Sequence, residues 1–214
     1  MNIILNILNT ALNYFFGLTG DLGIAIVLLT IGVKIILMPL SIKQKLGMLE
    51  QQKLSKDLEE LKEKYKNNKE KLDDEMQKYY TQNAKGMLGG FVSILQLPIV
   101  ITLYNVILKM PMQAGTVLIP WLASLKLSDN YFIIPFVYTL SMLAPNVLSY
   151  IPFLKISSQA KASKISIMIT SFFSVMITLK TPAAIGIYLI TTSIVTFMEE
   201  IIFRIYINRK AITN

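Results

Sequence analysis

The sequence contains no cysteine and no histidine among its 214 residues. Their absence excludes disulfide bonds, thiol chemistry and the usual cysteine and histidine ligands of zinc. The sequence also lacks the G-x-x-x-x-G-K-[ST] pattern with which many nucleotide hydrolases hold phosphates. We therefore expect no metal site, no cofactor and no nucleotide hydrolysis by the protein itself.

Charge is also scarce. Only 16% of the residues are charged and 53% are hydrophobic, whereas soluble domains have about 25% charged residues. Most of the charge lies in one segment, 43–86, which holds 11 basic and 9 acidic residues. This distribution is typical of an integral membrane protein. We expect a single domain over 1–214 in which 43–86 is the one large water-exposed element.

Long apolar runs fill most of the remaining chain. A helix of about 20 apolar residues crosses the hydrocarbon core of a bilayer. Five runs approach that length, and they predict an all-α membrane protein with five transmembrane helices at about 22–42, 89–109, 131–150, 165–180 and 184–203.

Basic residues predict the orientation of these spans. If the first span runs from outside to inside, the inner segments carry 17 basic residues and the outer segments carry only Lys109, Lys126 and Lys180. Because basic residues are enriched on the cytoplasmic side, we expect the N-terminus outside and the C-terminus in the cytoplasm.

Two further helical elements are expected outside the spans. Segment 43–86 has an apolar stripe at Leu54, Leu58, Leu61 and Tyr65 and another from Leu72 to Tyr80, which predicts a cytoplasmic helical hairpin with its turn at Asn67-Asn68. In residues 1–13, asparagines recur opposite isoleucines and leucines. This pattern predicts an amphipathic helix in the membrane interface, and the alternative is the beginning of the first span.

Lys34 lies in the middle of the first apolar run. A cation at that depth costs about 2.5–3.5 kcal/mol on insertion scales, so it is a candidate functional residue. The alternative is that its long side chain bends toward the headgroups.

Polar residues recur at helical spacing in three of the apolar runs. Any one such stripe is explained by helix packing, because serine and threonine are common at helix contacts in membranes. Together with Lys34 and Glu199, the three stripes suggest a shared polar cavity. They comprise Thr30, Lys34 and Ser41; Ser166, Thr170, Ser174 and Thr178; and Tyr188, Thr192, Thr196 and Glu199.

Five segments in order resemble the YidC family of membrane protein insertases over about residues 15–210. They are GIAIVLLTIGVKIILMPLSIKQ, KLSKDLEELKEKYKNNKEKLDDEMQKYY, GGFVSILQLPIVITLYNVI, SDNYFIIPFVYTLSM and TPAAIGIYLITTSIVTFMEEIIFRIYINR. The resemblance implies five core helices around a hydrophilic groove that is open to the cytoplasm and to lipid. The groove cation is usually arginine, and Lys34 matches it. Glu199 and Glu200 stand where the family often has paired glutamines. The implied groove residues are Lys34, Thr30, Gln96, Tyr188, Thr192, Thr196 and Glu199.

The resemblance further implies a function. The chain would act as an insertase and chaperone in the plasma membrane of a bacterium, independently of the Sec translocon or in association with it. Its partners would be nascent membrane proteins, the ribosome and the lipid bilayer, without specific nucleic acid. The competing interpretations are a small transporter or channel that uses Lys34 and Glu199, and a specialised scaffold for one membrane complex. No internal repeat supports a transporter.

Overall fold

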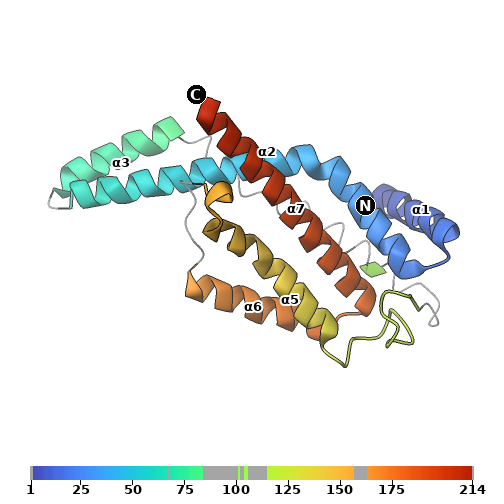
Figure 1. Cartoon of the computed structure of the whole chain (residues 1–214). Helices are drawn as coiled ribbons and strands as arrows, with labels where there is room; N and C mark the ends of the chain where they lie inside the picture. Colours follow the sequence, from blue (N-terminus) through green and yellow to red (C-terminus); the bar gives the residue numbers. More distant parts are fainter. Residues whose placement is uncertain are drawn as a thin grey trace. The chain divides into compact units, whose positions relative to one another are not determined.

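The computed structural model describes residues 2–66, 68–83, 101, 104–105, 115–156 and 163–213, and these residues form helices and loops without a strand (Figure 1). The helices are α1 (Asn2–Thr19), α2 (Leu22–Lys64), α3 (Lys69–Asn83), α5 (Ile133–Val147), α6 (Lys164–Leu179) and α7 (Ala183–Thr213), with short 3-10 turns η2 (Leu148–Tyr150) and η3 (Pro152–Leu154). The predicted all-helical class is confirmed for this part of the chain.

Among the described residues, three helical segments are long and apolar enough to cross a membrane, namely α2, Ile133–Tyr150 and α7. Helix α6 is apolar but has only 16 residues. It coincides with the shortest of the predicted spans. The predicted span at 89–109 lies almost wholly outside the described residues, so the number of five spans stays a prediction.

Helix α2 is longer than the sequence suggested. The prediction ended a span near residue 42 and began a separate hairpin at 43, whereas one helix of 43 residues continues past Pro39 to Lys64. The chain turns at Tyr65 and Lys66 before α3 begins. Asn68 accepts a hydrogen bond from the backbone N–H of Lys71 at 3.2 Å, as expected of a residue that caps a helix. The turn was predicted at Asn67-Asn68; Asn67 lies outside the described residues, and the hairpin stays a prediction.

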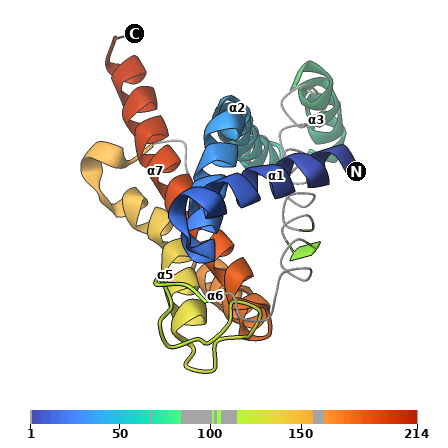
Figure 2. The same ribbon diagram turned by 90° about the vertical axis from the view of Figure 1, so that its right-hand side faces the viewer.

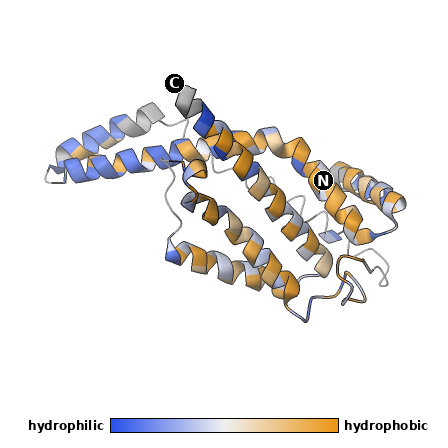
Figure 3. Cartoon of the chain, in the orientation of Figure 1, coloured by the Kyte–Doolittle hydropathy of each residue, from blue (hydrophilic) through white to orange (hydrophobic). Residues whose placement is uncertain are grey.

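The chain divides into two compact units within α2. The first unit contains residues 1–38, 97–155 and 161–214, and the second contains 39–96 and 156–160. Figure 3 shows the contrast in composition: α3 and the distal part of α2 are largely hydrophilic, whereas α5 and most of α7 are largely hydrophobic.

The core of the first unit combines α1, the beginning of α2, the loop 115–132, α5 and α7. Leu12 and Ile26 are fully buried, and Ile134 and Tyr188 are buried with them. Gly186 allows the close approach of α7 to α5, because a Cβ at this position would overlap the side chain of Ile134.

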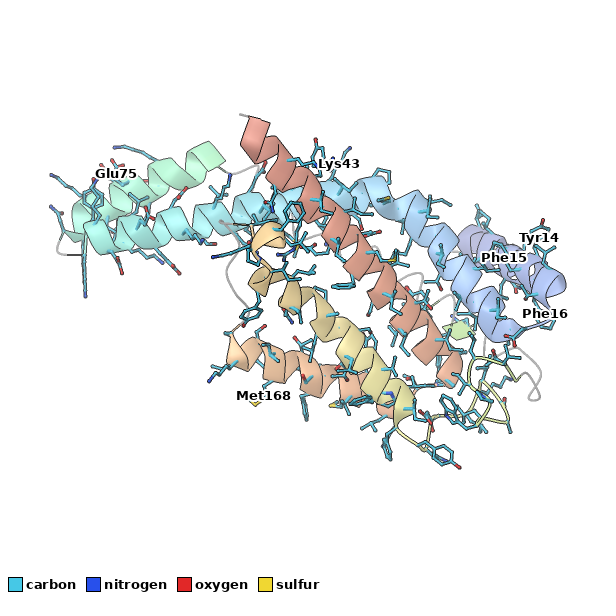
Figure 4. All side chains as sticks on the ribbon, viewed as in Figure 1. Tyr14, Phe15, Phe16, Lys43, Glu75 and Met168 are labelled. Carbon is cyan, nitrogen blue, oxygen red and sulfur yellow. The ribbon has the colours of Figure 1, made fainter. Side chains whose placement is uncertain are left out.

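One side of helix α1 consists of exposed apolar side chains. Ile3, Ile7, Tyr14 and Leu18 are all more than 60% exposed and lie on one side of the helix, as spacings of four and seven require. The exposed asparagines Asn6, Asn9 and Asn13 lie on another side. Figure 4 shows Tyr14 and Phe16 near the end of this helix. Apolar and polar side chains therefore lie on different sides of α1, and the amphipathic helix in the membrane interface stays a prediction.

The polar stripe of α6 packs against α5. The hydroxyls of Ser174 and Thr139 are 2.8 Å apart, and Ser174 and Thr178 are both buried. Ser166, at the beginning of the same stripe, is exposed. Met168 projects from the opposite side of the helix (Figure 4). The contact therefore favours the packing interpretation for this stripe.

The loop 115–132 lies at the ends of α5, α6 and α7 (Figure 2). Its carbonyls at Leu127 and Leu125 accept hydrogen bonds from the N–H groups of Ala183 and Ala184, at 2.8 and 3.0 Å. These are N–H groups at the beginning of α7, which have no partner within the helix itself. The loop thus caps α7 and fixes the position from which its polar face extends.

A candidate polar site between α2 and α7

The site begins with one hydrogen bond between two membrane helices. The Lys34 ammonium donates to the hydroxyl of Thr196 at 3.0 Å. Lys34 is 12 residues into α2 and Thr196 is 13 residues into α7. At about 1.5 Å per residue, both residues lie roughly 18–20 Å from the beginnings of their helices. The bond favours a polar site inside the helix bundle over a lysine that extends to the headgroups.

The α7 side of this site is a continuous polar face. Tyr188, Thr192, Thr196 and Glu199 lie within about 80° of one another around the helix, because each residue turns the helix by about 100°. Tyr188, Thr192 and Glu199 are all at least nine-tenths buried. The structure therefore places four of the predicted site residues together on one face, with Lys34 in contact at Thr196.

Two oxygens on this face are buried without a hydrogen-bond partner among the described residues. They are the Thr192 hydroxyl and Oε2 of Glu199. A buried polar atom without a partner costs about 1–3 kcal/mol, so most such atoms in proteins are paired. The face therefore has acceptor capacity that the described part of the chain does not use.

Of the two remaining predicted groove residues, the structure describes Thr30 and does not describe Gln96. Thr30 is buried one turn before Lys34, and its hydroxyl donates to the carbonyl of Ile26 on the same helix at 2.6 Å. That donor is therefore already satisfied within α2. Gln96 lies outside the described residues, and its part in the site stays a prediction.

The adjacent glutamates have different environments. Glu200 binds the Arg204 guanidinium at 2.8 Å, and Arg204 also donates to the carbonyl of Leu154 at 3.0 Å. Arg204 is only 2% exposed. This pair attaches α7 to the turn η3. This pair was not predicted from the sequence, although Glu200 and Arg204 have the spacing of four that joins side chains on a helix.

The structural roles of two aspartates, Asp21 before α2 and Asp129 within the loop 115–132, were also not predicted from the sequence. Asp21 precedes α2 and accepts hydrogen bonds from the Ile24 N–H (2.9 Å), the Thr116 hydroxyl (2.6 Å) and the Val117 N–H (2.7 Å). Burial by itself would raise the pKa of the Asp21 carboxyl, but these hydrogen bonds together lower that pKa below its usual value. An aspartate directly before an apolar run is a helix-capping signal that could have been used.

Asp129 has a comparable position before α5. It is buried and accepts hydrogen bonds from the Trp121 indole (3.1 Å), the Tyr131 N–H (3.0 Å) and the Ile134 N–H (2.7 Å). Asp21 and Asp129 therefore tie the loop to the beginnings of two helices. Their roles are structural, because their hydrogen bonds join the loop 115–132 to α2 and α5 and involve none of the residues of the Lys34 site.

These features define an integral membrane protein, all-helical in its described part, with a cation, hydroxyls and a carboxylate inside the apolar bundle. The chain belongs to the family described as 60Kd inner membrane protein, whose model matches residues 14–210.

Curated relatives carry the name membrane protein insertase YidC. One from Caldanaerobacter subterraneus is 30% identical over 198 residues, which cover 92% of this chain and 91% of the relative. One from Helicobacter pylori is 32% identical over 205 residues, which cover 93% of this chain. The chain spans only 36% of that longer relative.

Proposed function

We propose that the protein is a membrane protein insertase that moves weakly hydrophobic segments of nascent proteins into the bilayer. Membership of the family and the names of the relatives support this function. The single observation that carries the mechanism is the hydrogen bond between Lys34 and Thr196 inside the span region.

Lys34 supplies the charge that attracts a substrate. Thr196 accepts one hydrogen bond from the ammonium and so positions it, and a hydroxyl does this without adding a negative charge. Lys34 can then attract carboxylates in a translocated segment. The attraction must be brief, because a tightly bound pair would stop the segment from leaving.

The energy for insertion comes from the substrate and the membrane. Burial of the substrate's apolar residues favours the inserted state. An acidic segment that moves outward also gains about 2.3 kcal/mol per charge for each 100 mV of membrane potential. A hydrophilic groove formed by the polar faces of α2 and α7 would shorten the apolar path that such a segment has to cross.

The proposed orientation places the N-terminus outside and the hairpin and C-terminus in the cytoplasm of a bacterium. The distribution of basic residues supports it. The chain has no cysteine, so single cysteines at Ser55 and Asn130, both exposed, can be labelled with an impermeant maleimide in intact cells. Only the cysteine at position 130 should react; labelling at position 55 alone would invert the orientation.

The charged region of α2 and α3 would receive nascent chains from the ribosome. Its solvated helices and narrow apolar stripe support this role. Replacing Lys53–Tyr80 with a short Gly/Ser linker should leave a folded protein that inserts ribosome-delivered substrates poorly. If the shortened protein inserts them at the parent rate, this segment has no such role.

The function itself is tested in two ways. The gene should restore growth to a bacterium depleted of its own insertase. The purified protein in proteoliposomes should insert a small substrate with a neutral tail faster than protein-free liposomes do. Failure in both assays would contradict the proposed function.

A further inference from the structure

The face of α7 that contacts Lys34 carries both hydroxyl groups and an acidic group. Moving toward the α7 C-terminus, the Thr192 hydroxyl comes first, Thr196 with its bound Lys34 ammonium comes next, and the Glu199 carboxylate follows. Glu199 lies about 4.5 Å further along the helix axis than Thr196. Glu199 and the threonine that binds the Lys34 ammonium therefore lie about one helical turn apart on one face of α7.

The adjacent glutamate, Glu200, has an ion-pair partner within the same helix. Glu200 is bound by Arg204 at 2.8 Å. Oε2 of Glu199 is buried and has no hydrogen-bond partner among the described residues. Glu199 therefore lacks the structural pairing that explains Glu200, although both residues stand in the same turn.

Two adjacent threonines, Thr191 and Thr192, also differ in whether their hydroxyls have a hydrogen-bond partner. Thr191 donates its hydroxyl to the Ile187 carbonyl at 2.8 Å. Thr192, which points about 100° away around the helix, has no partner for its buried hydroxyl in the described part of the chain. Unsatisfied acceptors thus occur on the Lys34 side of α7 at two positions.

We propose that Glu199 is a second substrate-binding group, opposite in sign to Lys34, whose carboxylate accepts hydrogen bonds from a lysine or arginine in a translocated segment. This inference rests on the proposed function. A basic side chain satisfies the buried oxygen and forms a charge-assisted hydrogen bond, which is among the stronger polar contacts in proteins. The site then selects substrates by both signs of charge.

The test uses the full chain in proteoliposomes and one small substrate whose translocated tail is neutral, acidic or basic. Glu199→Gln keeps the shape of the side chain and removes its charge. We expect it to lower the ratio of basic-tail to neutral-tail insertion by about tenfold, in line with loss of a hydrogen bond to a charged group. The matched control is Glu50→Gln, which makes the same change in net charge at an exposed position of α2 outside the segment 53–80 and should leave the ratio unchanged.

A second measurement locates the substrate. Thr192→Cys and Thr191→Cys are conservative in size, and the chain has no other cysteine. With a single cysteine in the substrate tail, oxidation should form a disulfide crosslink from position 192 and not from position 191.

The outcomes separate the inference from the function on which it rests. If the parent protein inserts all three tails and Glu199→Gln keeps the parent's ratio of basic to neutral insertion, Glu199 does not bind substrate and the inference is wrong. A crosslink from 191 and not from 192 would also overturn it. If the parent inserts no tail faster than protein-free liposomes and also fails to restore growth to the depleted bacterium, the proposed function is wrong, and the inference is wrong with it.

Discussion

Lys34 and Thr196 are 162 positions apart in the sequence and are joined by a 3.0 Å hydrogen bond from the ammonium to the hydroxyl. The bond connects the first apolar run to the last. A lysine in such a run is costly, and its hydrogen bond to Thr196 gives the ammonium a partner on α7.

Asp21 should stabilise the connection between α2 and the loop 115–132. Asp21→Ala removes the acceptor of three hydrogen bonds and should lower the free energy of unfolding by about 0.5–2 kcal/mol, the usual range for loss of a helix cap. Thermal unfolding in detergent, followed by circular dichroism, measures the change. Asp73→Ala, at an exposed position of α3, is the control, and equal unfolding temperatures for the two variants would contradict this account.

The same residue predicts a pH dependence. The folded-state pKa of Asp21 is lowered from the usual 3.8, so its ionised form favours the folded state. Its contribution to stability is fully present above the unfolded-state pKa and is lost as the pH falls through the lower, folded-state pKa. The parent should therefore lose more stability than Asp21→Asn between pH 5 and the acid limit of folding. Parallel pH profiles for the two proteins would show that Asp21 does not cause the dependence.

The two adjacent glutamates should respond differently to the same substitution. Glu200→Gln leaves the buried Arg204 without its carboxylate and should destabilise the protein by about 3 kcal/mol, as for other broken buried ion pairs. Glu199→Gln loses no hydrogen bond to Oε2 in the described part of the chain, so its unfolding temperature should equal or exceed that of the parent. The reverse order in a thermal unfolding assay would show that the structural roles of the two glutamates are exchanged.

Gly186 should be required for the close packing of α7 on α5. Gly186→Ala places a Cβ against Ile134 and should cost about 1–3 kcal/mol through overpacking. Adding Ile134→Leu, which removes the branch at Cβ, should recover part of that loss.

Gly17→Ala is the control, because a Cβ there meets no atom within 4 Å. Alanine favours a helix, so this substitution should stabilise α1. If Gly186→Ala is as stable as Gly17→Ala, the close contact is not a constraint.

The sequence predicted the elements better than the contacts between them. Apolar length located the helices α5 with η2, α6 and α7, since an apolar run of that length has few alternatives. Spacing also placed Tyr188, Thr192, Thr196 and Glu199 on one face. The continuation of α2 past Pro39 was not predicted, because a proline inside a helical pattern usually marks an end or a kink.

The contacts within the site could be predicted only in part from the sequence, for a related reason. Spacing along one helix cannot show which residue of a distant helix lies opposite, so the sequence did not identify Thr196 as the partner of Lys34. The separate environments of Glu199 and Glu200 were equally hidden, because they depend on the position of the turn η3 and its Leu154 carbonyl.

The most direct test of the central claim is in vitro insertion by Lys34 variants into proteoliposomes, with one substrate that has an acidic or a neutral translocated tail. We expect Lys34→Arg to insert both substrates, because a guanidinium keeps the charge and binds carboxylates through two hydrogen bonds. Lys34→Ala should lower the ratio of acidic-tail to neutral-tail insertion by about tenfold, the effect of losing a charge-assisted contact, and Lys34→Glu should lower it further through repulsion. If Lys34→Ala inserts both substrates at the parent rates, the intramembrane charge is not part of the mechanism.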